Sequence, residues 1–482
     1  MANSSIKKNF MYQMIYEVLV MILPFVTSPY ISRVVGAEGL GVYTYSYSIA
    51  FYFVLFSMLG LKNYGNRAIA MVRDDKKRLN ETFSNIVTLH FIVSVICFVV
   101  YIGYIIMMKG QKIYAIIQIG YVLSGLLDIS WFYFGIEKFK MTVARSTIIR
   151  ILNVICIFVF VRDGSDLWKY CLIMSAGMFL SSLILWIPLK KYVSFVKPEP
   201  KKMIIHLKPM LILFIPAIAV SLYKYMDKIM IGSLSNKIQL GFYENAEKVN
   251  TIPLTVISSF GTVMMPKMSN LAARSDKQQA NKYMGLSMQF VMCLSFALAF
   301  GLAGVGKVFA PIFWGDEFVL SGTLIMALSI TVPFISFANI LRTQYLIPNE
   351  KDKDYIVSVA SGAVINLIVN ALLIPKHGAI GATIGTVLAE VTVCVIQTWS
   401  VRKALPLGGY FKSFAVFAPI GAVMFAAVFT FGNMMGCKLW VLIAQIAIGV
   451  AVYCVFAHIY FVKTKNEFYV STINTFKKKL RH

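Results

Sequence analysis

Long apolar segments follow one another along nearly the whole chain, separated by short loops. A helix that crosses a bilayer needs about 20 mainly apolar residues. Inside lipid, each backbone polar group must be bonded within the protein, which a helix achieves by itself. The pattern therefore predicts an all-α integral membrane protein with about fourteen transmembrane helices. Hydropathy places them at 10–32, 40–61, 83–107, 113–135, 146–162, 168–189, 209–232, 245–265, 284–306, 319–341, 356–374, 379–400, 413–432 and 439–462.

Composition agrees with this class. Only 14% of the 482 residues are charged, and the mean hydropathy is +0.73. Soluble domains carry about 25% charged residues. Lys7 and Lys8 precede an apolar stretch that is too long for the core of a signal peptide, so we expect that stretch to be a helix of the protein.

Basic residues gather in every second connection between the apolar segments. Of 46 Lys and Arg, 34 lie in one alternate set of connections and the termini, and 9 lie in the other. The positive-inside rule then places both termini in the cytoplasm, which requires an even number of spans. The net charge of +25 is thus explained by lipid headgroups and topology, and we expect no nucleic-acid partner.

Two internal matches indicate a duplicated chain. Gly41-x-Tyr43 aligns with Gly241-x-Tyr243 at an offset of 200, and Asn153 aligns with Asn366 at an offset of 213. Duplicated halves are common in transporters, with the substrate path between them. We therefore expect two pseudo-repeated six-helix lobes around a central cavity, followed by an extra helix pair. The corresponding ranges are an N-terminal lobe at 1–197, a C-terminal lobe at 198–404, and two helices with a basic tail at 405–482.

The predicted seventh span carries three charges. Lys224 and Lys228 share a helical face, and Asp227 lies beside them. A charge at mid-bilayer costs at least ~2.5–3.5 kcal/mol. Two explanations are open: an internal Lys–Asp pair that stabilises the bundle, or a hydrated cavity into which these side chains point.

Further charges lie near the ends of spans. Glu244 and Lys248 are four residues apart at the start of the eighth span, with Glu247 beside them. They form either an ion pair within one helix or part of the same cavity mouth. Arg33 ends the first span above Pro24 and Pro29, which make that helix bendable or are incidental.

Tyrosine and phenylalanine alternate at the start of the second span. Residues spaced by two do not share a helix face, so only a subset can line a cavity, and the others belong to the interfacial aromatic belt. Asn366 and Asn370 share a face and are expected to join helices by hydrogen bonds. Glu390 follows the close-approach pattern Gly381-x-x-x-Gly385 and is either a protonated packing residue or an ion relay.

Several classes of active site have no signature here. The chain has no GxxxxGK[ST] phosphate loop and no HExxH motif, and its seven cysteines have no CxxC spacing. We expect no enzyme activity, no metal, no disulfide and no cofactor, apart from coupling to a proton or sodium gradient.

Three segments resemble Wzx-type oligosaccharide flippases of the multidrug/oligosaccharidyl-lipid/polysaccharide exporter superfamily. They are PFVTSPYISRVVGAEGLGVYTYSYSIAFYFVLFSMLGLKNYGNRAIAMVRDD (24–75), SLYKYMDKIMIGSLSNKIQLGFYENAEKVNTIPLTVISSFGTVMMPKMS (221–269) and PKHGAIGATIGTVLAE (375–390). The resemblance implies a V-shaped cavity between two lobes. It also implies movement of undecaprenyl-pyrophosphate-linked oligosaccharide from the cytoplasmic to the outer leaflet by alternating access, in the bacterial plasma membrane.

This resemblance suggests roles for the charges. A pyrophosphate is strongly anionic, and cations in a low-dielectric cavity offset its desolvation. We expect Lys224 and Lys228 to attract the headgroup, with Arg33 and Lys248 secondary and Asp227 as their exchangeable partner. The expected glycan contacts are Tyr43, Tyr223, Tyr225 and Tyr243, and the candidates for ion coupling are Asp227, Glu244, Glu247 and Glu390.

Other functions stay open. The same superfamily contains lipid II flippases and drug/cation antiporters, although an exporter of cationic drugs should have an acidic cavity. An integral-membrane polysaccharide polymerase would usually have a large exterior loop, and every exterior loop here is short. Expected partners are the lipid-linked oligosaccharide, membrane lipids, and the polymerase and chain-length proteins of the same pathway.

The topology predicts which loops an impermeant thiol reagent can reach. Ser235→Cys should react from outside the cell, because its loop belongs to the set with few basic residues. Ser275→Cys should react only from inside. Labelling in intact and opened cells, compared with the native cysteines alone, measures this, and the reverse pattern would overturn the topology.

Overall fold

The computed structural model describes residues 2–464, with side chains from Leu23 onward except that of Tyr223. Throughout this range the elements are helices, and no strand occurs within it. The chain divides into two compact units, 1–244 and 245–482. This division falls inside one long helix, whereas the lobe boundaries expected at 197 and 404 follow the sequence repeat. Those boundaries stay predictions, and the tail from 465 lies outside the described residues.

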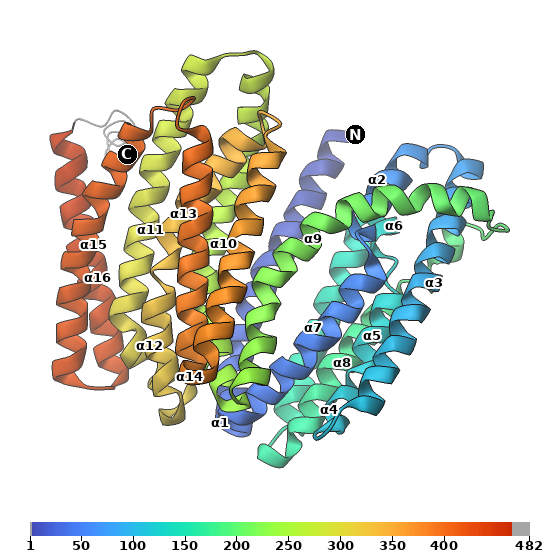
Figure 1. The fold of residues 1–482 in the computed structure, drawn as a ribbon, viewed down its shortest axis with the longest axis horizontal. Coiled ribbons are helices and arrows are strands. Elements are labelled where there is room, and N and C mark those ends of the chain that lie inside the picture. Colours follow the sequence, from blue (N-terminus) through green and yellow to red (C-terminus); the bar gives the residue numbers. More distant parts are fainter. Residues whose placement is uncertain (1, 465–482) are drawn as a thin grey trace. The chain divides into compact units, whose positions relative to one another are not determined.

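The first unit contains nine helices and the start of a tenth within its described part. Their bounds are α1 (Ala2–Met58), α2 (Leu61–Val72), α3 (Lys76–Met107), α4 (Lys112–Ile117), α5 (Ile119–Leu126), α6 (Ser130–Gly135), α7 (Phe139–Phe160), α8 (Leu167–Ile184), α9 (Pro200–Leu234) and α10 (Lys237–Ala273). Figure 1 shows these helices from blue to green.

The second unit begins within α10 and continues through the remaining helices. These are α11 (Lys277–Trp314), α12 (Val319–Leu328), α13 (Thr331–Leu341), α14 (Asp352–Val401), α15 (Leu407–Met435) and α16 (Leu439–Lys463). Short π-helical and 3₁₀ segments extend some of them. Arg342–Leu346, a π-helix, follows α13 directly.

Local sequence explains where several helices start and stop. Asp75 caps α3, because its carboxylate accepts hydrogen bonds from the backbone N–H groups of Lys77 and Arg78. Asp276 caps α11 in the same way through Gln279. Gly436 ends α15 with a φ of 76°, a conformation that suits glycine.

Two helices are each broken at a glycine. The backbone of α1 leaves helical geometry at Gly36, with a φ of 69°, and that of α14 does so at Gly378, with a φ of 53°. Figure 1 shows the two parts of α1 running in opposite directions. In α14, Gly385 packs against the side chain of Asn370, which would be about 22 Å away along a straight helix. Both helices therefore fold back on themselves.

These breaks affect the number of spans. Ten helices of the described chain are long and apolar enough to cross a membrane, or eleven if the bent pair Asp316–Leu328 and Thr331–Leu346 is one span. Fourteen were predicted. The difference has two sources. Each 50-residue segment with an internal break counts as one span, although two spans were predicted there, and α10 is too polar to count as a span. The all-helical membrane class is confirmed, and the number fourteen stays a prediction.

The repeat at an offset of 200 has a physical counterpart in the first unit. A Cβ on Gly41 would clash with the backbone carbonyl of Lys237, and a Cβ on Gly241 would clash with that of Ala37. Gly241 lies 200 residues after Gly41, and Lys237 lies 200 residues after Ala37. Each contact is therefore the counterpart of the other in the repeat. The aligned glycines thus let the second part of α1 and the start of α10 approach until their backbones touch.

Each unit contains an Asn–Gly contact near the other match, although in the second unit the side chain is that of Asn370, four residues after Asn366, which aligns with Asn153. Asn153 of α7 packs against Gly177 of α8, and Asn370 in the first part of α14 packs against Gly385 in its second part. Asn366 and Asn370 are buried on one face and bonded to each other, with a distance of 3.2 Å between Nδ2 and Oδ1. Gly381 meets the backbone at Leu373 and Ile374, so the predicted close approach is confirmed.

Enlarging Gly41 should separate α1 from α10. Gly41→Ala should destabilise the protein by ~1–3 kcal/mol, the usual cost of overpacking, and lower its melting temperature in detergent. Gly103→Ala is the matched control, because no atom lies within 4 Å of the added Cβ and alanine favours a helix. Equal melting temperatures of Gly41→Ala and the unchanged protein would contradict this close approach.

Candidate functional site

Two neighbouring polar contacts join α9 to α10. The hydroxyl of Tyr243 donates to Asp227, with 3.0 Å between the oxygens. The ammonium of Lys228 lies 2.8 Å from a carboxylate oxygen of Glu244. We call these four residues the polar cluster. All four belong to the first unit.

The polar cluster lies inside the unit. Asp227 and Tyr243 are each 2% exposed, and the side chains of Lys228 and Glu244 are 12% and 13% exposed. Charges removed from water in this way need a partner, since an isolated one costs several kcal/mol. Pairing across the α9–α10 hairpin therefore lets an apolar helix carry Asp227 and Lys228 through the membrane.

Aromatic rings from α1 continue the cluster. Tyr43, Tyr47 and Phe51 are spaced by four residues, so they share one face of α1. Phe51 stacks on Tyr225 of α9 with ring centroids 3.8 Å apart, and the Lys228 ammonium lies 5.3 Å from the centroid of the Tyr225 ring. We call Tyr43, Tyr47, Phe51 and Tyr225 the aromatic row.

The row extends toward α5 and α8. Tyr47 stacks on Tyr121 at 4.8 Å, and Tyr43 lies 4.7 Å from Tyr170. The sequence predicted that only a subset of the alternating aromatics could share a surface, and the structure selects Tyr43, Tyr47 and Phe51. Tyr121 and Tyr170 were missed. The only signal for them was a tyrosine within an apolar segment, which also fits ordinary core packing.

Lys224 differs from Lys228. It is exposed on α9, one helical turn before Lys228, and it has no hydrogen bond or ion pair within the described residues. It lies ten residues before the end of α9, or ~15 Å along the helix axis. An unpaired ammonium at this depth favours water over lipid as its surroundings.

The remaining predicted residues are distributed over both units. Arg33 is exposed near the break in α1. Glu247 and Lys248 are half-buried on α10 within the second unit, and Glu390 of α14 is 8% exposed. The side chain of Tyr223 lies outside the described residues. Tyr243 is buried, and its hydroxyl is directed to Asp227 in this conformation.

The partner of Glu244 shows what spacing alone could not decide. Its distance of four residues from Lys248 left open a pair within one helix or a place at the cavity mouth, and the structure shows its carboxylate against Lys228 of the preceding helix. An ion pair between helices can be opened by an anion that replaces the carboxylate. The same site contains aromatic faces and hydroxyl groups. Among the side chains that the structure describes, no three of His, Cys, Asp or Glu gather as metal ligands would.

Comparison with known proteins places the chain in a family. The family model "Polysaccharide biosynthesis protein" matches residues 6–272, more than half of the chain. The chain belongs to this family. Residues 154–451 also match the model "Lipid II flippase MurJ". Together these matches make it a Wzx-type flippase of the multidrug/oligosaccharidyl-lipid/polysaccharide exporter superfamily, as the resemblance of the sequence indicated.

Named relatives agree with this family. A Shigella dysenteriae protein that carries the name O-antigen transporter is 24% identical over 82% of this chain and 100% of its own length. The capsular polysaccharide biosynthesis protein CapF of Staphylococcus aureus is 24% identical over 80% of this chain and 96% of its own. The protein is therefore a polysaccharide-related flippase in class and a multi-span transporter.

Solved structures show the same fold. The lipid II flippase MurJ in an inward closed conformation matches 95% of this chain and 100% of its own, with a TM-score of 0.79 and 15% identity. An outward-facing multidrug resistance transporter of the MATE family covers 85% of this chain and 96% of its own, with a TM-score of 0.50 and 15% identity. At these identities the likeness is one of fold alone.

The buried pair should show non-additive stability. Lys228→Met removes the ammonium that faces the buried Glu244 carboxylate, and Glu244→Gln removes the charge that faces the Lys228 ammonium. Each single variant should cost ~3 kcal/mol, whereas the double variant should cost clearly less than the sum. Melting temperatures of the four proteins in one detergent measure this cycle. Additive losses would mean that the two side chains do not interact.

Proposed function

We propose that this protein moves undecaprenyl-pyrophosphate-linked oligosaccharide repeat units from the cytoplasmic to the outer leaflet of a bacterial plasma membrane. The movement occurs by alternating access and supplies surface polysaccharide synthesis. The likeness to the Shigella dysenteriae protein over its full length supports the substrate class. Both termini lie in the cytoplasm in this proposal, as the basic loops predict, and the product passes to a polymerase and chain-length proteins.

One structural observation carries the proposal. α9 presents an exposed ammonium, Lys224, one turn from a second ammonium whose partner is a replaceable carboxylate. A pyrophosphate could contact Lys224 first and then compete with Glu244 for Lys228. The exchange keeps each buried charge paired, which lowers the cost of moving the headgroup through a low-dielectric region.

The aromatic row suits the glycan part of the substrate. Tyrosine combines a flat apolar face, on which a sugar ring can rest, with a hydroxyl that can form hydrogen bonds. In this proposal Tyr43 and Tyr225 contact sugars, and Tyr223 joins them. Tyr243 takes part only when it leaves Asp227. Arg33 and Lys248 act as secondary attractors for the headgroup.

Gradient coupling uses the same carboxylates. Protonation of Glu244 would remove its attraction for Lys228 and free the ammonium for the headgroup. Asp227, held by Tyr243, and Glu247 are further candidates in this part of the chain. Glu390, buried on α14, is the candidate of the second unit. Proton or sodium uptake at one of these groups would then bias the transporter toward loading or release.

A second function has a specific observation in its favour. Residues 154–451 match the MurJ family model, and the MurJ fold covers 95% of this chain with a TM-score of 0.79. Lipid II presents the same type of anionic headgroup on a different glycan. Rescue of cells depleted of their own lipid II flippase would favour this function, and rescue of cells without their O-antigen or capsule flippase would favour the first.

The lysines of α9 provide the direct test. Replacing both Lys224 and Lys228 by Ala should abolish glycan export while the protein remains in the membrane. Lys224→Gln alone should reduce surface polysaccharide at least tenfold without loss of stability, because Lys224 has no partner to lose. Surface polysaccharide and membrane protein are measured in the same cells.

Lys208→Gln is the matched control. Lys208 is also an exposed lysine of α9, but it lies toward the cytoplasmic end. Its replacement should leave export unchanged. Normal surface polysaccharide in the Lys224 and Lys228 double variant would refute headgroup recognition by these two lysines.

A further inference from the structure

A pocket separate from the polar cluster lies between helices of the first unit. Its volume is about 410 Å³, within the range of small-molecule sites. The walls come from the second part of α1, the end of α3, the start of α4 and the start of α10. Neither Lys224 nor Lys228 lines it. Every lining residue belongs to the first unit.

Some lining groups already have partners and hold the walls in place. The Tyr101 hydroxyl donates to the carbonyl of Ala115 at 2.8 Å, which ties α3 to α4. The Tyr45 hydroxyl lies 3.0 Å from the hydroxyl of Ser233. Lys237 donates to the carbonyl of Gly232 at 2.6 Å, and its ammonium lies 3.0 Å from the centroid of the Tyr45 ring.

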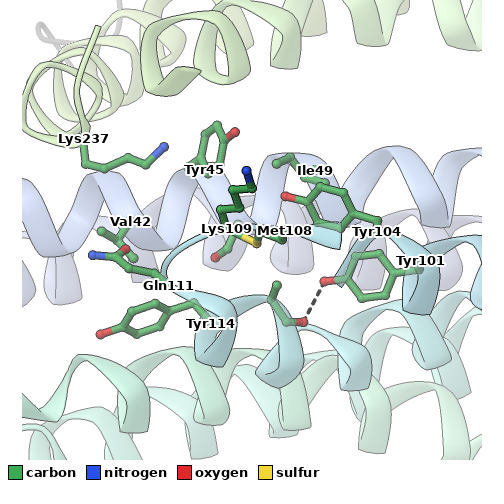
Figure 2. A pocket seen from close by; sticks show the side chains of 12 residues that line it. Val42, Tyr45, Ile49, Tyr101, Tyr104, Met108, Lys109, Gln111, Tyr114 and Lys237 are labelled. Carbon is green, nitrogen blue, oxygen red and sulfur yellow. Dashed lines mark hydrogen bonds between the residues drawn. The ribbon is translucent and has the colours of Figure 1, made fainter. Parts of the chain in front are cut away.

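Other lining groups have no partner among the described residues. These are the ammonium of Lys109, the side-chain amide of Gln111, and the hydroxyls of Tyr104 and Tyr114. Figure 2 shows the amino ends of Lys109 and Lys237 pointing toward the space beside Tyr45, with the Tyr104 hydroxyl next to them. Hydrogen-bonding groups of several kinds thus converge on one cavity without being used by the protein.

The charge of the pocket is one-sided. Two lysines line it, and none of its twelve lining residues is an aspartate or glutamate. Two ammonium groups that line one cavity favour an anionic ligand. Tyrosine faces together with uncommitted amide and hydroxyl groups favour a sugar ring over a bare anion, since an ion such as phosphate has no apolar face to stack.

The loops around the pocket give its side of the membrane. Lys109 and Lys237 lie in connections that the distribution of basic residues assigns to the exterior. They are two of the nine basic residues in that set, where lysine is uncommon. A binding role explains why lysines occur in these exterior loops, which the positive-inside rule alone does not explain.

We propose that this pocket is an exterior binding site for an anionic sugar, one that carries a carboxylate or phosphate group. Lys109 and Lys237 bind the anionic group, and Tyr104, Tyr114 and Gln111 bind the sugar hydroxyls. The binding itself does not depend on the proposed transport. Its use as a holding site for a glycan that has just reached the outer leaflet rests on that function.

Direct binding to the purified full-length chain tests the proposal. In phosphatidylcholine nanodiscs, glucuronic acid should give saturable binding by calorimetry and saturation-transfer NMR, and glucose should bind at least tenfold more weakly. Lys109→Met should weaken glucuronic acid binding at least tenfold without altering melting temperature, because Lys109 has no partner. Tyr104→Phe, which keeps the ring and removes the hydroxyl, should weaken it several-fold.

Lys112→Met is the matched control for charge. Lys112 lies in the same turn but does not line the pocket, and its ammonium donates to the carbonyl of Ile106. It should bind glucuronic acid like the unchanged protein. Equal weakening by Lys112→Met would reduce the effect to general surface charge and overturn the site.

Three further results would also overturn it. They are absence of glucuronic acid binding, equal binding of glucose, and inorganic phosphate that competes as well as glucuronic acid. Loss of binding in nanodiscs that contain phosphatidylglycerol would assign the pocket to a lipid headgroup instead. Failure of glycan export with intact glucuronic acid binding would refute the transport function and leave this site standing.

Discussion

The first unit depends on the backbone contact between α1 and α10. Gly41 and Gly241 have no side chain, so the carbonyls of Lys237 and Ala37 can occupy the space where Cβ atoms would be. This contact brings the start of α10 to α1, and α9 comes with it because only a short turn separates the two helices. The aromatic row and the pocket that Lys109 and Lys237 line both use surfaces that this approach creates.

Charge pairing is the second constraint, and it follows from the first. Once α9 and α10 lie together against α1, Lys228 and Asp227 are removed from both lipid and water. Each then has a partner on α10, Glu244 and Tyr243 respectively. A buried ion pair of this kind contributes little net stability, since desolvation offsets the attraction. Its value lies in being replaceable: another anion can take the place of the carboxylate at small net cost.

Much of the architecture was predictable from the sequence. The helical class, the alternating basic loops and the two internal repeats come from patterns that act locally or add along the chain. The close approach at Gly381 and Gly385 was predictable too, because small residues four apart have one common use in membrane helices. The breaks at Gly36 and Gly378 fall between spans that hydropathy had already separated, 10–32 from 40–61 and 356–374 from 379–400.

Amino-acid sequence alone determined that this chain crosses a membrane as helices and that α9 carries charges requiring an explanation, and it predicted duplicated halves. Tertiary structure decided which groups meet: Glu244 pairs with Lys228 of the preceding helix, and Lys109 shares a pocket with Lys237, 128 residues away. The physical reason is that hydropathy and spacing describe one helix at a time. Which charges pair depends on which helix faces pack together, and in the first unit Gly41 and Gly241 determine this packing.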